Sequence, residues 1–177
     1  GVQTCALPIW SNANSRMRKT GIDPKRLFAV DAMLAIWRDG AYAQIVLPDL
    51  LRNSKFEQRD KNFLTQLIYT SLRSFGRNQS IISYLSKEKL ERVDMKIQMI
   101  LHLALTEILE MRSKDRAVVF EYVEISKKIA GISSGSFVNA ILRQAGRENE
   151  VTGNLLKEVG KGLDELSELA LRTSHPN

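Results

Sequence analysis

The residues best suited to chemistry form a ridge of two arginines and an asparagine in the last third of the chain. Asn139, Arg143 and Arg147 recur every four residues. At about 100° per residue they share one face of a helix, whereas Phe137 and Ile141 fall on the opposite side. Arginine suits phosphate because its planar fork binds two oxygens and stays charged. The spacing therefore predicts a helix that packs through one side and offers phosphate contacts on the other.

A second set of basic residues is expected earlier in the chain. Arg59, Arg73 and Arg77 fall within about 40° of one another on a helical wheel, away from the apolar residues of the same segment. Lys25 and Arg26 are weaker candidates near the start of the first predicted helix. A single arginine opposite a core stripe is usually just solvated. The two ridges together favour contact with RNA or DNA.

Three patterns resemble catalytic or ligand-binding motifs, and each has a simpler explanation. Residues 131–135 fit G-x-S-x-G, but that nucleophile motif needs a preceding strand, and a glycine C-cap followed by a serine N-cap explains it better. Residues 160–162 begin a dinucleotide fingerprint that lacks its third glycine and its strand. His102 lies in an apolar run and is interpreted as a core-edge residue rather than a metal ligand. We therefore expect no catalytic residue, no metal site and no cofactor site in this chain.

The charge is distributed unevenly. Net charge is +6, but residues 1–147 hold 23 Lys and Arg against 14 Asp and Glu, whereas residues 148–177 hold 3 against 6. A basic body with an acidic end points to a polyanionic partner, most often nucleic acid, although excess charge also serves solubility.

The composition is that of one folded domain, with 177 residues of which 44% are hydrophobic. No apolar run approaches the roughly eighteen residues that a membrane span requires, so no membrane partner is expected. The single cysteine, Cys5, excludes an internal disulfide and a thiolate metal site, and it is compatible with a reducing, cytoplasmic location.

The elements that must position these residues are helices, because apolar residues recur at helical spacing and period-two alternation is nowhere sustained. Asp23 and Pro24 offer an N-cap and a first helical position. Asp60 lies towards the apolar side of its helix, where it can cap backbone N–H groups or pair with a cation. The predicted helices cover residues 24–38, 41–52 (with Pro48 inside), 58–75, 79–85, 90–111, 115–131, 137–147 and 154–171, with a turn at 133–136. The fold class is all-α, a bundle of about seven to eight helices.

The two ends of the chain are interpreted separately from the domain. Residues 1–9, GVQTCALPI, lack any helical or strand period and do not form a signal peptide. They resemble a translated sequencing adapter, and we interpret them as an artefact. Residues 10–24 are expected to be a flexible basic lead, residues 25–149 the folded domain, and residues 150–177 a linker helix.

Three stretches of the chain resemble a known family. They are RDKNFLTQLIYTSLR (59–73), AVVFEYVEISKKIAG (117–131) and FVNAILRQAGRE (137–148). Together they resemble the NusB-like all-helical RNA-binding domain over roughly residues 25–147, and FVNAILR is the most specific part. The resemblance implies an RNA-binding bundle. In it, the residues that contact phosphates or sugar hydroxyls would be Arg73, Arg77, Asn139, Arg143 and Arg147, with Lys25 and Arg26 as the weaker candidates.

Two branches of this family are possible, and the end of the chain favours one. Antitermination factors of the NusB type stand alone, whereas ribosomal RNA cytosine-5 methyltransferases of the RsmB type carry the domain at their N-terminus. The LR that ends NAILR is similar to the second branch. So is LRTSHP at 171–176, although Thr173 stands where tyrosine is usual.

The methyltransferase branch implies that this chain is the non-catalytic front piece of an enzyme that acts on 16S rRNA. S-adenosylmethionine (SAM) would then serve the full-length parent rather than this fragment, and the catalytic domain beyond Asn177 would be a partner in cis. Two alternatives remain open: an antitermination factor that binds RNA and a partner protein, and a helical adaptor whose grooves bind protein and whose arginines are rim charges.

Overall fold

The computed structural model describes residues 22–38, 42–86, 92–111, 113, 115–152 and 155–160, and these form eight helices and no strand. The helices are α2 (Pro24–Arg38), α3 (Ala43–Arg52), α4 (Gln58–Arg73), α5 (Phe75–Ser86), α6 (Met95–Leu109), α7 (Asp115–Ala130), α8 (Ile132–Thr152) and α9 (Leu155–Gly160). The predicted all-α class is confirmed, and Pro48 lies inside α3 as expected. The adapter-like segment, the basic lead before residue 22 and residues 161–177 lie outside the described residues. None of the described helices is long and apolar enough to cross a membrane.

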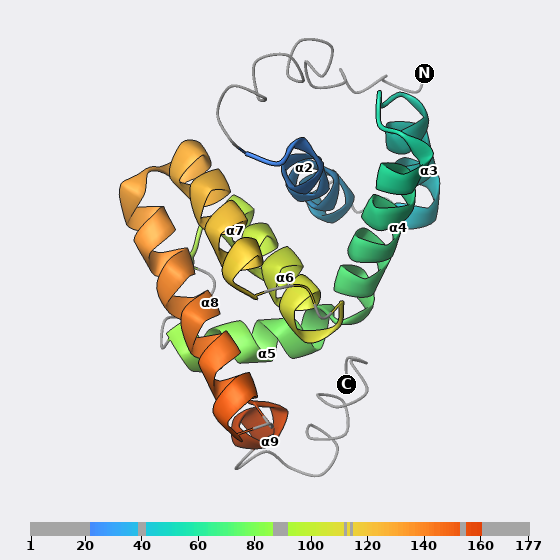
Figure 1. The fold of residues 1–177 in the computed structure, drawn as a ribbon. Coiled ribbons are helices and arrows are strands. Elements are labelled where there is room, and N and C mark those ends of the chain that lie inside the picture. Colours follow the sequence, from blue (N-terminus) through green and yellow to red (C-terminus); the bar gives the residue numbers. More distant parts are fainter. Residues whose placement is uncertain are drawn as a thin grey trace.

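Helix α6 is the centre of the bundle, and it contacts α2, α4, α5, α7 and α8 (Figure 1). Residues 99–108 are all buried, which is the pattern of a helix that is surrounded by others. The helix begins at Met95 rather than at residue 90, because the Asp94 side chain caps it by accepting the Lys96 N–H at 2.8 Å. Residues 87–91 lie outside the described part of the chain.

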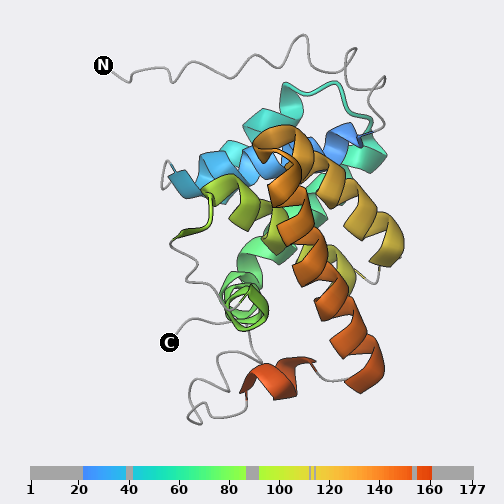
Figure 2. The same cartoon turned by 90° about the vertical axis from the view of Figure 1, so that its left-hand side faces the viewer.

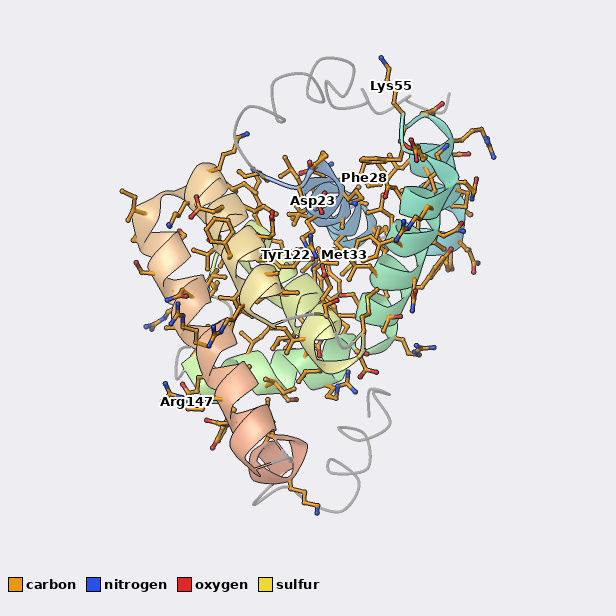
Figure 3. All side chains as sticks on the ribbon, viewed as in Figure 1. Asp23, Phe28, Met33, Lys55, Tyr122 and Arg147 are labelled. Carbon is orange, nitrogen blue, oxygen red and sulfur yellow. The ribbon has the colours of Figure 1, made fainter. Side chains whose placement is uncertain are left out.

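Helix α2 begins as the sequence predicts. The Asp23 side chain accepts the Lys25 N–H at 3.0 Å, so Asp23 is the N-cap of a helix whose first residue is proline. Apolar residues recur at helical spacing along this helix and predict a buried stripe at Leu27, Val30, Met33, Leu34 and Trp37. Met33 is fully buried in the interior of the bundle (Figure 3). Trp37 departs from the prediction, because it is 47% exposed at the end of the helix.

Helices α7 and α8 form a hairpin that is tighter than predicted. Gly131 ends α7 with a φ of 89° and donates its N–H to the Lys127 carbonyl at 2.9 Å, which confirms the glycine C-cap. Helix α8 begins at the next residue, so the predicted turn at 133–136 is wrong and its serines lie in the first turns of the helix. Gly135 is buried against the Lys127 side chain, which a Cβ at this position would overlap. The G-x-S-x-G pattern therefore serves helix packing.

The boundaries of α4 and α5 differ from the prediction. The sequence predicts a helix to residue 75 followed by a short one at 79–85, whereas α4 ends at Arg73 and α5 spans Phe75–Ser86. The helix is interrupted at Ser74, and α5 then runs across one end of the bundle (Figure 1). Buried Asn78 holds α5 against α6, because its amide donates to the His102 carbonyl at 3.2 Å and to Thr106 Oγ1 at 3.0 Å. Figure 2 shows α8 extending past α5, with α9 at its far end.

His102 is a core residue rather than a core-edge one. It has no exposed surface, and its ring stacks on Phe75 with centroids 3.8 Å apart. Burial lowers its pKa to about 3, so the imidazole is neutral. Among the described residues, no group of three His, Cys, Asp or Glu side chains is placed to hold a metal ion.

Acid should destabilise the domain through His102. Its folded pKa of about 3 lies below the ordinary 6.5, so between these values the unfolded chain binds a proton that the folded chain excludes. The free energy of unfolding therefore falls as the pH drops from 6.5 towards 3, by at most about 1.4 kcal/mol per pH unit. Asp31 acts in the opposite sense: burial raises its pKa from 3.8 to about 6, partly offset by Lys96. The stability that protonated Asp31 contributes is therefore lost as the pH rises from 3.8 towards about 6.

Urea unfolding between about pH 4 and pH 7 tests both effects. His102→Leu should flatten the loss of stability towards acid. Asp31→Asn should steepen it, because the opposing titration is removed. A His102→Leu profile parallel to that of the parent chain would contradict the assignment of a buried neutral imidazole.

Candidate nucleic-acid interface

The predicted ridge on α8 faces away from the core. Val138, Ile141, Leu142 and Ala145 are buried, whereas Arg143 and Arg147 are exposed and Asn139 is half-buried. Figure 3 shows Arg147 on the outer side of α8. The predicted division of this helix into a core face and an arginine face is therefore confirmed.

Within the described part of the chain, the guanidinium groups of this ridge have no acidic partner. The Arg143 Nε donates to Asn139 Oδ1 at 2.8 Å, which orients the guanidinium and leaves its two terminal nitrogens available. Among the described residues, neither Arg143 nor Arg147 has a carboxylate within ion-pair distance. The three side chains cover about 12 Å of helix axis. Such a row can hold successive oxygens of a polyanion.

Arg59 and Arg73 lie on α4, near its two ends. Both side chains are exposed, and no carboxylate of the described residues pairs with either. Helices α4 and α8 lie on opposite sides of α6 in Figure 1. The α4 arginines therefore lie apart from the α8 ridge.

Arg77 does not lie on α4. The break at Ser74 places it on α5, where its side chain is 9% exposed and forms an ion pair with Glu110. The helical wheel aligns Arg77 with Arg59 and Arg73 only because it continues one helix through the break. Contact of Arg77 with RNA stays a prediction, and the guanidinium is already engaged by a carboxylate.

Arg26 lies in a partly buried ionic cluster. It donates from Nε to Glu107 Oε1 at 2.9 Å, from Nη2 to Glu107 Oε2 at 2.7 Å and from Nη1 to Asp23 Oδ2 at 2.7 Å. Glu107 has no exposed surface, and Tyr122 donates its hydroxyl to Glu107 Oε1 at 2.7 Å. Burial alone would lower the pKa of Arg26, but the hydrogen bond and charge of Glu107 raise it. Burial, reinforced by Glu107, raises the pKa of Tyr122.

This cluster shows what the sequence reasoning missed. The charge of Arg26 alone makes it an RNA candidate, and its sequence position reveals neither Glu107 nor Tyr122 as a partner. A signal was nevertheless present, since a carboxylate in an otherwise apolar helix needs a buried cation. Contact of Arg26 with RNA stays a prediction, and the geometry assigns its guanidinium to the core.

Lys25 also forms an ion pair, although its side chain stays partly exposed. Its Nζ lies 3.3 Å from Asp60 Oδ1 and 6.0 Å from the centre of the Phe63 ring, and the side chain is 31% exposed. One of the two roles considered for Asp60, pairing with a cation, is therefore confirmed. The ion pair joins the start of α2 to α4.

The fold and these surfaces define an all-helical domain with a neutralised charge in its core and basic residues on two outer faces. The chain belongs to the NusB family, because the NusB family model matches residues 23–147. The resemblance stated from the sequence is thereby confirmed.

Both branches of the family are represented among similar proteins. The probable ribosomal RNA small subunit methyltransferase B of Bacillus subtilis is 29% identical over 165 residues, which cover 90% of this chain and 34% of that protein. The transcription antitermination protein NusB of Syntrophomonas wolfei is 33% identical over 120 residues, which cover 67% of this chain and 85% of that protein. The chain thus spans about a third of the length of the methyltransferase relative.

Solved structures share the fold. A chain in a crystal structure of antitermination factors NusB and NusE in complex with dsRNA superposes with a TM-score of 0.64 at 21% identity, over 75% of this chain and 97% of that one. T. maritima NusB gives a TM-score of 0.63 at 24% identity, over 72% of this chain and 93% of that one. The predicted NusB-like bundle is therefore the observed fold.

Removing the central carboxylate should unfold the domain more easily. Glu107→Ala leaves the largely buried Arg26 guanidinium with Asp23 alone and removes the acceptor of the Tyr122 hydroxyl. We therefore expect a loss of about 3 kcal/mol in the free energy of unfolding, measured with urea. Glu124→Ala is the matched control, because it breaks the exposed Glu124–Lys127 pair and should cost at most about 1 kcal/mol. Equal, small losses in the two variants would show that the cluster is not a structural centre.

Proposed function

We propose that this chain is an RNA-binding domain that contacts the RNA backbone through the α8 ridge. The observation that supports this most directly is the exposure of Arg143 and Arg147 on a helix whose other face is in the core. Among the residues that the structure describes, neither has an acidic partner. Side chains held in this way can contact phosphate without disturbing the fold. The family membership supports the proposal, and so does a structural neighbour that was crystallised in a complex with dsRNA.

We propose further that the RNA is the small-subunit 16S rRNA and that the chain is part of a SAM-dependent methyltransferase. The support is a relative named ribosomal RNA small subunit methyltransferase B, which aligns with 90% of this chain and is about three times as long. The described residues form helices and no strand, so they offer no strand–turn–helix unit for a nucleotide-like cofactor. In this proposal, SAM belongs to another part of the enzyme, which would be a partner in cis.

Transcription antitermination is the second candidate. It is favoured by the Syntrophomonas wolfei relative, 85% of whose length aligns with this chain. Sequencing the gene beyond the codon for Asn177 would distinguish the two candidates. A catalytic domain there would establish the methyltransferase, and a stop codon would rule it out.

The prediction concerns the α8 ridge. Changing Arg143 and Arg147 to alanine should weaken binding to a 16S rRNA fragment and to an unrelated hairpin alike, because backbone contacts carry no sequence information. In a salt titration of RNA affinity, the log–log slope should fall by about 0.7–0.9 for each phosphate that the variant no longer neutralises. The helical circular dichroism signal should be unchanged, because both side chains point to solvent.

The double variant Arg52→Ala, Lys55→Ala is the control, because it removes the same charge from a region away from α8 (Figure 3). It should leave most of the affinity and the slope intact. Equal decreases in affinity for the two double variants would mean that overall charge, and not the ridge, binds RNA. Binding that shows no salt dependence would favour a protein-binding adaptor instead.

A further inference from the structure

Three aromatic rings from three helices form a stack that begins in the core and ends at the surface. His102 of α6 lies nearly parallel to Phe75 of α5, with centroids 3.8 Å apart and planes inclined by 10°. Phe75 also stacks on the indole of Trp37 at the end of α2, at 4.3 Å and 18°. Because two rings cannot share one face, Phe75 lies between the imidazole and the indole. The buried end of the stack is fixed by the core, since His102 has no exposed surface.

The outer end of this stack is open. Trp37 is 47% exposed although Phe75 covers one face of its indole, so the exposed area lies on the other face and the edges. The neighbouring surface is also unobstructed, because a Cβ built on exposed Gly76 would meet nothing within 4 Å. A tryptophan that only fills the core is normally covered much more completely.

An exposed cation lies two positions before Phe75, the middle ring of the stack. Arg73 is the last residue of α4, two positions before Phe75, so their Cα atoms are at most about 7 Å apart. Its side chain is exposed, and among the described residues no carboxylate is within ion-pair distance of it. The backbone of this arginine therefore lies close to that of Phe75, the ring on which Trp37 stacks.

We propose that Trp37 stacks an unpaired nucleobase of the bound RNA, as a fourth ring on the stack, while Arg73 contacts a neighbouring phosphate. Every nucleobase has a planar π face that stacks on aromatic side chains. Only single-stranded segments, loops and bulges expose such faces, whereas a duplex keeps them covered. The pairing of a flat ring with a cation matches the base and phosphate of one nucleotide. The stacking contact therefore distinguishes single-stranded from duplex RNA, which the backbone contacts of the α8 ridge do not.

This inference rests on the proposed RNA-binding function and adds a second contact with a different chemistry. It is testable directly, because the chain has two tryptophans, Trp10 and Trp37. In a Trp10→Phe background, all tryptophan emission comes from Trp37. A single-stranded, mixed-sequence RNA oligonucleotide should quench that emission through base stacking, and a blunt-ended RNA duplex should leave it nearly unchanged. No quenching by the single strand, or equal quenching by the duplex, would overturn the inference.

Affinity measurements give an independent readout. Trp37→Leu should weaken binding of the single-stranded oligonucleotide by roughly five- to a hundredfold and leave duplex binding unchanged. Trp37→Phe should recover part of the affinity, because it keeps a ring. Arg73→Ala should weaken single-strand binding and reduce its salt dependence. Tyr84→Leu is the matched control, since Tyr84 lies on α5 and is 46% exposed, and it should bind like the parent chain.

The outcomes separate this inference from the proposed function. If the Trp37 variants bind single-stranded RNA like the parent chain while the α8 double variant binds weakly, the stacking inference fails and the RNA-binding function stands. If neither RNA binds to the parent chain, both fail. If Trp37→Leu loses its helical signal, the fluorescence of the unaltered Trp37 decides the question.

Discussion

The carboxylate of Glu107 constrains the rest of the structure, because it is a charge without exposed surface in the central helix. A buried charge is tolerated only when it is paired and hydrogen-bonded. Arg26 from α2 and Tyr122 from α7 supply those contacts, so one side chain fixes two helices against α6. The same guanidinium reaches Asp23, the residue that caps α2. Neutralisation of the core and initiation of the first described helix are thus carried out by one cluster.

The surfaces available for binding depend on which arginines are already paired with carboxylates inside the domain. Arg26 and Arg77 pair with carboxylates, whereas Arg73, Arg143 and Arg147 are exposed and pair with no carboxylate of the described segments. A basic net charge therefore does not translate into one continuous basic face. It leaves an arginine ridge on α8 and, across α6 in Figure 1, a region near the end of α4.

These two surfaces suit different features of a nucleic acid. The α8 ridge is charged and hydrogen-bonding, and such groups position a phosphate backbone whatever its sequence. The region at the end of α4 adds the half-exposed indole of Trp37, which stacks on Phe75, and Phe75 in turn stacks on His102. A domain with both surfaces can hold a structured RNA by its backbone and register an unpaired base. That combination fits the proposed RNA-binding function.

The sequence by itself determined the features that depend on neighbours three or four residues away. Helical periodicity, the Asp23 cap, the Gly131 C-cap and the two faces of α8 were all predictable, because an amphipathic helix specifies its own buried side. The tertiary structure decided whatever joins distant residues. Arg26 and Glu107 are 81 positions apart, so no local pattern could show that the arginine is neutralised. The interruption at Ser74 is likewise a matter of packing, since α5 lies across one end of the bundle against α6. That interruption places Arg77 in a buried position.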